Sequence, residues 1–186
     1  MKAIPTELPE VFRVQVPRWG DARGWFMETW REDRAAAIGI AGPFVQDNAS
    51  FSAVAGTIRG LHYQVAPAAQ GKLVRVVRGA IWDVAVDVRP SSPTFGRWVG
   101  LSLDAASGEQ LWIPAGFAHG FCTLEPDTEV AYKVTALYAP EHERGLAWDD
   151  PDLALPWPLP PGGPTLSERD RAHPSLSVLR ASWVSA

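Results

Sequence analysis

The segment GAIWDVAVDV, residues 79–88, decides the fold class. Apolar side chains at positions 82, 84, 86 and 88 alternate with the carboxylates of Asp83 and Asp87. Successive side chains of a β-strand point to opposite faces, so this two-residue period predicts a half-buried strand with one apolar face and one wetter face.

The same pattern recurs along the chain in short apolar segments separated by Gly, Pro, Ser and Asp turns. The further strand candidates are KLVRVV (72–77), RWVGLSL (97–103), QLWIP (110–114), GFCTL (120–124) and EVAYKVTALY (129–138). REDRAAAIG (31–39) predicts one short helix, and PWPLPPGGP (156–164) predicts an irregular loop. We therefore expect residues 1–186 to form a single all-β domain, a sandwich or barrel with minor helical additions.

Composition limits the class of protein. The chain has 186 residues, of which 46% are hydrophobic and 20% charged, enough for one core. One cysteine, Cys122, excludes an intramolecular disulfide and a Cys-rich zinc site. A net charge of −4 and no long apolar run predict a cytoplasmic protein that binds neither membrane nor nucleic acid. Small molecules or further copies of the chain are the expected partners.

Three proton-active side chains are predicted to face the interior from three different strands. Lys72 shares a face with the valines at 74 and 76, and Tyr132 shares one with the valines at 130 and 134. His62 lies in the strand candidate around IRGLHYQ. Strict alternation sends Arg59 away from His62, so both reach one ligand only if the strand ends, twists or bulges near Gly60.

Eight segments in order resemble the dTDP-4-dehydrorhamnose 3,5-epimerase family. They are RGWFMET (23–29), FVQDNAS (44–50), IRGLHYQ (58–64), QGKLVRVVRG (70–79), DVAVDVR (83–89), SPTFGRWVG (92–100), LWIPAGFAHGF (111–121) and LSERD (166–170). The resemblance runs from about Asp21 to about Pro174. It implies a cupin jelly roll with short peripheral helices, a homodimer with exchanged N-terminal strands, and epimerisation of a dTDP-4-dehydro-6-deoxy-glucose substrate at C3 and C5 without a cofactor or metal.

The resemblance also implies roles for four catalytic residues. By similarity, His62 is the base, Asp170 orients it, Lys72 stabilises the oxygen at C4, and Tyr132 returns the proton from the opposite face. A hydrogen next to a ketone is weakly acidic, so its removal needs both a positioned base and stabilisation of the enolate oxygen. Histidine and tyrosine have ordinary pKa values suited to these two roles.

A second group of residues is implied to bind the nucleotide sugar, some of them across the dimer. By similarity they are Arg23, Glu28, Gln46, Asn48, Arg59, His119, Glu143 and Arg169. Three positions depart from the family pattern: Ala49, Arg169 where lysine is frequent, and Tyr138. The apolar segment EVFRVQV (10–16) needs a partner for its backbone donors, and pairing with another subunit's sheet would supply one.

Each assignment has a structural alternative. His62 and Tyr132 are alternatively core residues whose polar atoms find local partners. Lys72 is alternatively an edge-strand lysine that blocks aggregation. Asp170 lies three residues after Ser167, which is the spacing of a capping box, so its carboxylate alternatively satisfies only backbone donors. Arg23 and Arg59 are alternatively ordinary surface arginines.

The segment PAGFAH (114–119) resembles the second metal-binding motif of cupins and makes His119 a candidate ligand. A lone imidazole holds a transition ion poorly, because such sites need at least three protein ligands. We expect His142 and His173 to lie on surface loops, so no metal site is predicted. The rival functions are a metal-dependent cupin, a noncatalytic sugar-nucleotide-binding cupin, and an epimerase that acts at C3 or C5 only.

Overall fold

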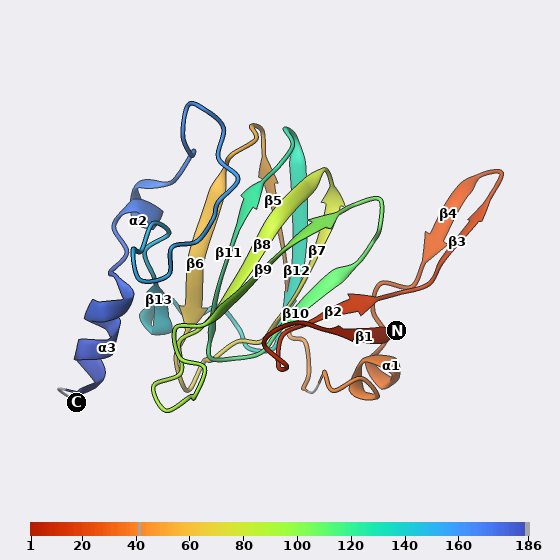
Figure 1. The fold of residues 1–186 in the computed structure, drawn as a ribbon. Coiled ribbons are helices and arrows are strands. Elements are labelled where there is room, and N and C mark those ends of the chain that lie inside the picture. Colours follow the sequence, from red (N-terminus) through yellow and green to blue (C-terminus); the bar gives the residue numbers. More distant parts are fainter. Residues whose placement is uncertain (41, 185–186) are drawn as a thin grey trace.

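Two antiparallel sheets lie face to face in the computed structural model, which describes residues 1–40 and 42–184 (Figure 1). The six-stranded sheet has the order β1 (Lys2–Pro5), β2 (Phe12–Gln15), β10 (Gln110–Ile113), β7 (Lys72–Arg78), β12 (Thr128–Val134) and β5 (Gln46–Ser52). The five-stranded sheet has the order β13 (Glu143–Gly145), β6 (Ile58–Gln64), β11 (Phe117–Thr123), β8 (Ala80–Asp87) and β9 (Trp98–Asp104). This is a jelly roll, and the predicted fold class is confirmed.

The remaining elements are short and lie at the periphery. They are the hairpin β3 (Arg18–Asp21) and β4 (Gly24–Met27), the helices α1 (Glu32–Ala36), α2 (Glu168–Arg171) and α3 (Leu176–Val184), and the 3-10 turn η1 (Pro140–His142). Helix α1 falls inside the segment predicted to be helical, and residues 156–164 form no helix or strand, as predicted for that loop. No helix in the described part of the chain is long and apolar enough to cross a membrane.

Strand β8 is buried on both faces, which corrects the prediction of a wetter face. Asp83 and Asp87 are both fully buried. Their face carries Ile81 into the core between the two sheets, while Trp82 on the other face packs under the C-terminal segment that includes Leu176. The two carboxylates are buried with partners, because Asp83 binds a histidine and Asp87 binds arginine, serine and threonine side chains.

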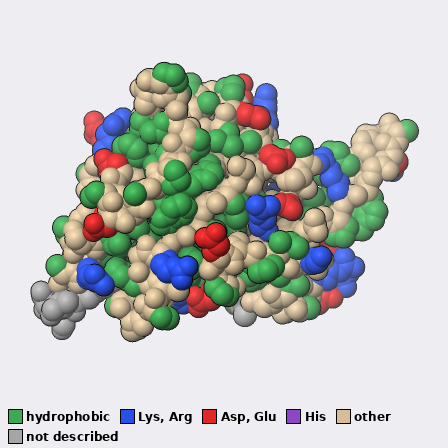
Figure 2. Space-filling view, in the orientation of Figure 1, with side chains coloured by type: hydrophobic (Ala, Val, Ile, Leu, Met, Phe, Trp, Pro, Cys, Tyr) green, Lys and Arg blue, Asp and Glu red, His purple; other side chains and the backbone are tan. Residues whose placement is uncertain are grey.

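Strand β2 is paired on both sides within its own chain, which corrects a second expectation. It lies between β1 and β10 in the six-stranded sheet, so its backbone groups do not need another subunit. The unpartnered N-terminal feature is instead the β3–β4 arm, which extends away from the sheets (Figure 1). Trp19, Trp25 and Phe26 on this arm are 51%, 57% and 68% exposed, and apolar side chains are visible along it in Figure 2.

A bulge in β6 turns two polar side chains to the same face, which is one of the three irregularities near Gly60 that alternation left open. His62 lies opposite His119 on β11, whereas Arg59 lies opposite Phe121, so the register shifts between the two pairs. Gly60 at the shift has φ +124°, and a Cβ there would lie 2.5 Å from the Cα of Gly120. Only glycine accommodates this close approach of β6 to β11. Arg59 and His62 therefore both face the space between the sheets.

Candidate active site

Two adjoining cavities between the sheets share three polar side chains. The cavities have volumes of about 220 and 260 Å³, and His62, Lys72 and Tyr132 line both of them. His62 comes from the five-stranded sheet, and Lys72 and Tyr132 come from the six-stranded sheet. The inward positions predicted for all three residues are confirmed. Lys133, the neighbour of Tyr132, points outward and binds Asp47 at 2.8 Å, as alternation requires.

His62 is joined to a buried carboxylate. Its Nε2 lies 2.6 Å from Oδ1 of Asp170, whose side chain is only 7% exposed. Burial opposes ionisation of Asp170, but hydrogen bonds from His62 and Ser167 outweigh it and lower the pKa of the carboxyl. An ionised carboxylate only accepts hydrogen bonds, so Nε2 of His62 carries the proton and Nδ1 keeps a free electron pair.

The alternative in which the carboxylate of Asp170 satisfies only backbone donors is wrong, because that carboxylate binds His62, although the predicted helix cap is present. Ser167 caps helix α2 because its Oγ accepts a hydrogen bond from the backbone N–H of Asp170 at 3.0 Å. The carboxylate of Asp170 is left to bind His62. The short helix thus fixes the backbone position from which the carboxylate reaches β6.

Lys72 is a buried interior lysine and not an edge residue. Strand β7 lies between β10 and β12, and the side chain donates a hydrogen bond from Nζ to the carbonyl of His62 at 3.0 Å. Burial lowers the pKa of Lys72 to about 8, although Asp83 and Glu143 oppose the change. The ammonium is therefore a charged donor at neutral pH, next to the base and facing the cavities.

Tyr132 faces the cavities from β12, opposite Val74 of β7 and Asn48 of β5. Burial raises the pKa of its hydroxyl, while the positive charge of Arg59 opposes the change. The phenol consequently holds its proton at neutral pH and can donate it to a site in the cavity.

His119 forms a second buried pair. Its Nε2 lies 2.6 Å from Oδ1 of Asp83, and its side chain is 7% exposed. Burial lowers the pKa of His119 despite the carboxylate beside it. Because its Nε2 is engaged with Asp83, His119 stands in the cavity wall as a polar group, opposite His62 in the β6–β11 register.

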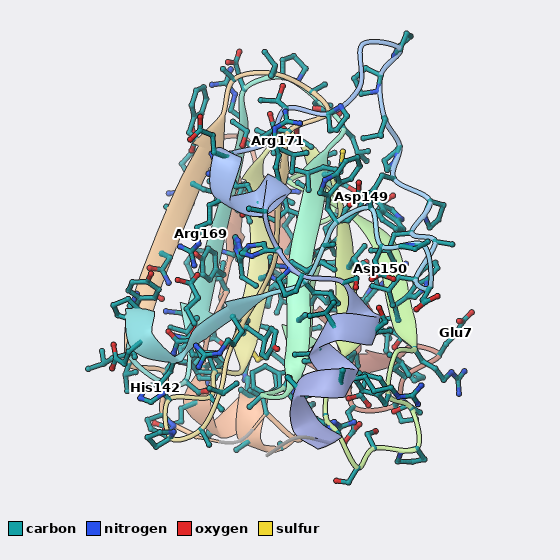
Figure 3. All side chains as sticks on the ribbon, turned by 90° about the vertical axis from the view of Figure 1, so that its left-hand side faces the viewer. Glu7, His142, Asp149, Asp150, Arg169 and Arg171 are labelled. Atoms are coloured by element: carbon teal, nitrogen blue, oxygen red, sulfur yellow. The ribbon has the colours of Figure 1, made fainter. Side chains whose placement is uncertain are left out.

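The structure brings five of the predicted binding residues to the two cavities besides His119. They are Gln46, Asn48, Arg59, Glu143 and Arg169. Glu143 accepts a hydrogen bond from the hydroxyl of Tyr138 at 2.6 Å and pairs with Arg169. Burial alone would raise the pKa of Glu143, but the hydrogen bonds from Arg169 and Tyr138 lower it. Arg169 lies on the side of the molecule that faces the viewer in Figure 3.

Arg23 and Glu28 do not join the site of their own chain. Arg23 lies in the β3–β4 arm, its side chain is 90% exposed, and it pairs with Asp21 at 2.6 Å. Glu28 pairs with Arg34 at 3.0 Å. Neither residue lines either cavity. Within one chain the two residues are therefore separated from His62.

His173 is a residue that sequence reasoning misplaced. His173 lies in a loop between α2 and α3, as predicted, but the predicted surface placement is wrong, because its side chain is 11% exposed and its Nε2 lies 3.5 Å from Oδ1 of Asp170. Its ring stands edge-on to that of His62, with centroids 5.4 Å apart. Burial and the neighbouring His62 lower its pKa. Its position three residues after Asp170, just past the end of α2, was the available signal. His142, by contrast, is partly exposed beside Glu141.

Comparison with known proteins agrees with this geometry. A family model described as dTDP-4-dehydrorhamnose 3,5-epimerase matches residues 5–178. A protein of that name from Sinorhizobium fredii is 52% identical over 180 residues, which cover 95% of this chain and 90% of the relative. The crystal structure of a dTDP-6-deoxy-D-glucose-3,5-epimerase from Legionella pneumophila, in complex with dTDP-4-keto-L-rhamnose, has a TM-score of 0.92 and 44% identity. It covers 97% of this chain and 95% of that chain.

A 3'-monoepimerase also matches. Its crystal structure, from Streptomyces bikiniensis and in complex with dTDP-quinovose, has a TM-score of 0.87 and 34% identity, covering 97% of this chain and 90% of that chain. The family model nevertheless spans nearly the whole chain, and the relative that is 52% identical carries the double-epimerase name. The chain therefore belongs to the dTDP-4-dehydrorhamnose 3,5-epimerase family.

Proposed function

We propose that residues 1–186 act as one cupin-like epimerase unit that converts dTDP-4-dehydro-6-deoxy-glucose to dTDP-4-dehydro-L-rhamnose, a step of dTDP-L-rhamnose biosynthesis. The observation that carries this proposal is the pairing of His62 with Asp170 at 2.6 Å at the edge of a cavity that Lys72 and Tyr132 enter from the opposite sheet. Base, oxyanion donor and acid are the three groups that epimerisation next to a ketone requires.

The proton is removed by His62. Asp170 holds the proton of the imidazole on Nε2, which leaves Nδ1 as the atom that accepts the hydrogen from the carbon next to the C4 ketone. The positive charge that then develops on the ring is stabilised by the ionised Asp170 across the same hydrogen bond. The dyad thus provides both the tautomer and the charge balance of the base.

The residues that stabilise the enolate oxygen and return the proton, Lys72 and Tyr132, both come from the six-stranded sheet. The ammonium of Lys72 stabilises the oxygen at C4, where negative charge develops when either neighbouring carbon loses its hydrogen. Tyr132 then donates its proton to the face opposite His62, because the two side chains come from facing sheets. Protonation from the opposite face inverts the carbon. A ring flip presents the second hydrogen to the same imidazole.

The nucleotide part is bound by residues around the cavities and by a second subunit. Arg59 and Arg169 offer guanidinium groups that suit diphosphate oxygens, and Gln46 and Asn48 offer amides. We propose a homodimer in which the β3–β4 arm crosses to the partner and brings Arg23 and Glu28 to the partner's site. The exposed aromatic side chains of the arm support this, since they lack a cover in the single chain.

We place the enzyme in the cytoplasm, with no organic cofactor in the reaction. The buried free thiol of Cys122 suits a reducing compartment.

The reaction is tested by incubating the enzyme with dTDP-4-dehydro-6-deoxy-glucose in D2O and following C3 and C5 by NMR. Deuterium is expected at both carbons with inversion. His62→Asn should abolish exchange at both carbons and leave dTDP binding intact, because phosphate contacts come from arginines. Tyr132→Phe should retain exchange while losing net inversion, since the base remains. Wild-type exchange in His62→Asn would reject the proposed base.

A second candidate is epimerisation at one carbon only. The similarity to a 3'-monoepimerase keeps this candidate open, and Tyr138 is one of the positions that depart from the family pattern. Label at a single carbon would select this function. Label at both carbons would exclude it.

A further inference from the structure

Three potential metal ligands meet behind the substrate cavity, and the proposed reaction leaves one of them without a role. One ligand atom from each of His62, Asp170 and His173 lies within 4.8 Å of the other two. Nε2 of His173 is buried and makes no hydrogen bond within the described residues; it lies 3.5 Å from Oδ1 of Asp170, an oxygen that already binds His62. A buried, unpaired ring nitrogen next to a carboxylate needs a partner, because an unsatisfied buried polar atom is costly.

We propose that His62, Asp170 and His173 bind a divalent first-row transition ion such as Zn²⁺, and that the bound ion switches the enzyme off. This site is not the one considered from the sequence, in which His119 was the candidate ligand. His119 binds Asp83 and does not belong to this cluster. The argument that a lone imidazole cannot hold an ion fails here, since the fold places a second imidazole beside His62.

One ligand spacing already suits such an ion, and a second requires a small movement. With Zn–N and Zn–O bonds of about 2.0–2.2 Å, two ligands of a tetrahedral zinc lie about 3.3 Å apart. Nε2 of His173 and Oδ1 of Asp170 are 3.5 Å apart. Nε2 of His62 is 2.6 Å from the same oxygen, so this hydrogen bond must open by roughly 0.7 Å to reach the tetrahedral spacing. Two imidazoles and one carboxylate leave a fourth position for water.

Access also permits binding. The ligands are reached from two sides: His62 and Asp170 line the substrate cavity, and His173 lines an outer hollow of about 400 Å³ beside Gly145. An ion can therefore enter without crossing the hydrophobic core.

Inhibition follows from the tautomer of His62. An ion bound to Nε2 takes the electron pair of that nitrogen, so the single proton of the neutral ring moves to Nδ1. Nδ1 is the atom assigned as the base, and once protonated it cannot accept a hydrogen from the substrate. This consequence rests on the proposed function. It predicts that zinc lowers kcat while dTDP binds as before, because the ion does not occupy the nucleotide site.

Metal binding is tested without turnover. Chelator-treated wild-type protein is titrated with Co²⁺, and the visible absorption of the bound ion is followed, then displaced with Zn²⁺. One Co²⁺ per chain is expected. His173→Asn should weaken binding by at least about 100-fold, since even second-shell losses cost 10- to 100-fold. The matched control, His142→Asn, removes a partly exposed histidine outside the cluster and should bind like wild type.

Folding of each variant is checked by its circular dichroism spectrum. If His173→Asn does not fold, His62→Asn serves in its place, because it removes a different ligand of the same ion. No stoichiometric Co²⁺ binding to wild type would overturn the proposal, as would wild-type affinity in both ligand variants.

Activity provides the second readout. Zn²⁺ should abolish turnover by wild type reversibly, with recovery on adding chelator, and leave the Kd for dTDP unchanged. His173→Asn should keep its turnover in Zn²⁺. Equal inhibition of His173→Asn would contradict the site. If the enzyme failed to act on the proposed sugar while Co²⁺ bound as described, the site would stand and only the proposed function would fall.

Discussion

Replacing Lys72 with methionine should stabilise the protein and inactivate it. At pH 7 the folded state holds a buried ammonium whose pKa lies at about 8, against 10.5 for an ordinary lysine. This difference corresponds to about 3 kcal/mol of unfavourable free energy in the folded state. Methionine removes that cost, and it also removes the hydrogen bond to the carbonyl of His62, which is worth about 1 kcal/mol.

The net expectation is a gain of about 2 kcal/mol in the free energy of unfolding at pH 7. Between pH 8 and 10.5 the unfolded chain keeps the lysine proton that the folded chain has lost, so wild-type stability should rise with pH and the difference should shrink. Loss of the enolate donor should lower kcat by about 10²–10³.

Urea unfolding at pH 7 and pH 10 and at one fixed protein concentration measures the gain in stability from this substitution. Lys133→Met is the matched control, because Lys133 points outward to an exposed Asp47 and its removal should cost at most about 1 kcal/mol. A destabilised Lys72→Met protein at pH 7, or one with kcat within tenfold of wild type, would refute this account of the buried charge.

Three shorter predictions address the base, the pH profile and the bulge. Asp170→Asn should place the His62 proton on Nδ1 and therefore lower kcat by about 10²–10⁴. The affinity for dTDP, measured by calorimetry, should not change. An unaltered kcat would show that the dyad is not catalytic. In wild type, kcat at saturating substrate should fall above about pH 8 as Lys72 loses its proton, and a flat profile to pH 9.5 would contradict this. Gly60→Ala should lower the free energy of unfolding, measured by thermal unfolding, by more than about 2 kcal/mol, because the added Cβ would lie 2.5 Å from the Cα of Gly120. The control Gly162→Ala adds a Cβ in open space and should change that free energy by no more than about 0.5 kcal/mol.

Local alternation predicted the inward faces well because it depends only on neighbouring residues. Tyr132 and Lys133 point to opposite sides of β12, and Lys72 follows the valines of β7 inward. Alternation also required an irregularity near Gly60 if Arg59 and His62 reach one ligand, but it did not choose between a strand end, a twist and a bulge. Arg59 and His62 are three positions apart, so a regular strand would place them on opposite faces. An extra residue in the strand brings them to the same face, and Gly60 adopts the backbone conformation that this requires.

Burial imposed by distant segments could not be predicted from local pattern. Asp83 and Asp87 were predicted to lie on a wetter face, yet both are buried: Asp83 binds His119 of β11, and Asp87 binds side chains of the loop that follows β8. His173 is a loop residue as predicted, but its burial comes from packing of its ring against His62 of β6 and Gly145 of β13. Both errors have one physical cause: burial is decided by contacts between residues far apart in the sequence.

The separation of Arg23 from His62 in one chain leads to a last prediction about the dimer. If the arm completes the partner's site, each site of a dimer combines Arg23 of one chain with His62 of the other. Arg23→Ala and His62→Asn homodimers should then both be weakly active or inactive. A mixed dimer contains one site with both defects and one site with neither.

Mixing the two inactive variants should therefore restore activity. Random exchange of subunits at a 1:1 ratio makes half of the dimers mixed, each with one intact site, so about a quarter of wild-type turnover is expected. Mixing His62→Asn with Asp170→Asn is the matched control, because both residues belong to the same chain's site and every site keeps one defect. Sedimentation confirms that the variants remain dimers. Recovery absent from the first mixture, with exchange verified by mass spectrometry, would mean that Arg23 does not act across the interface.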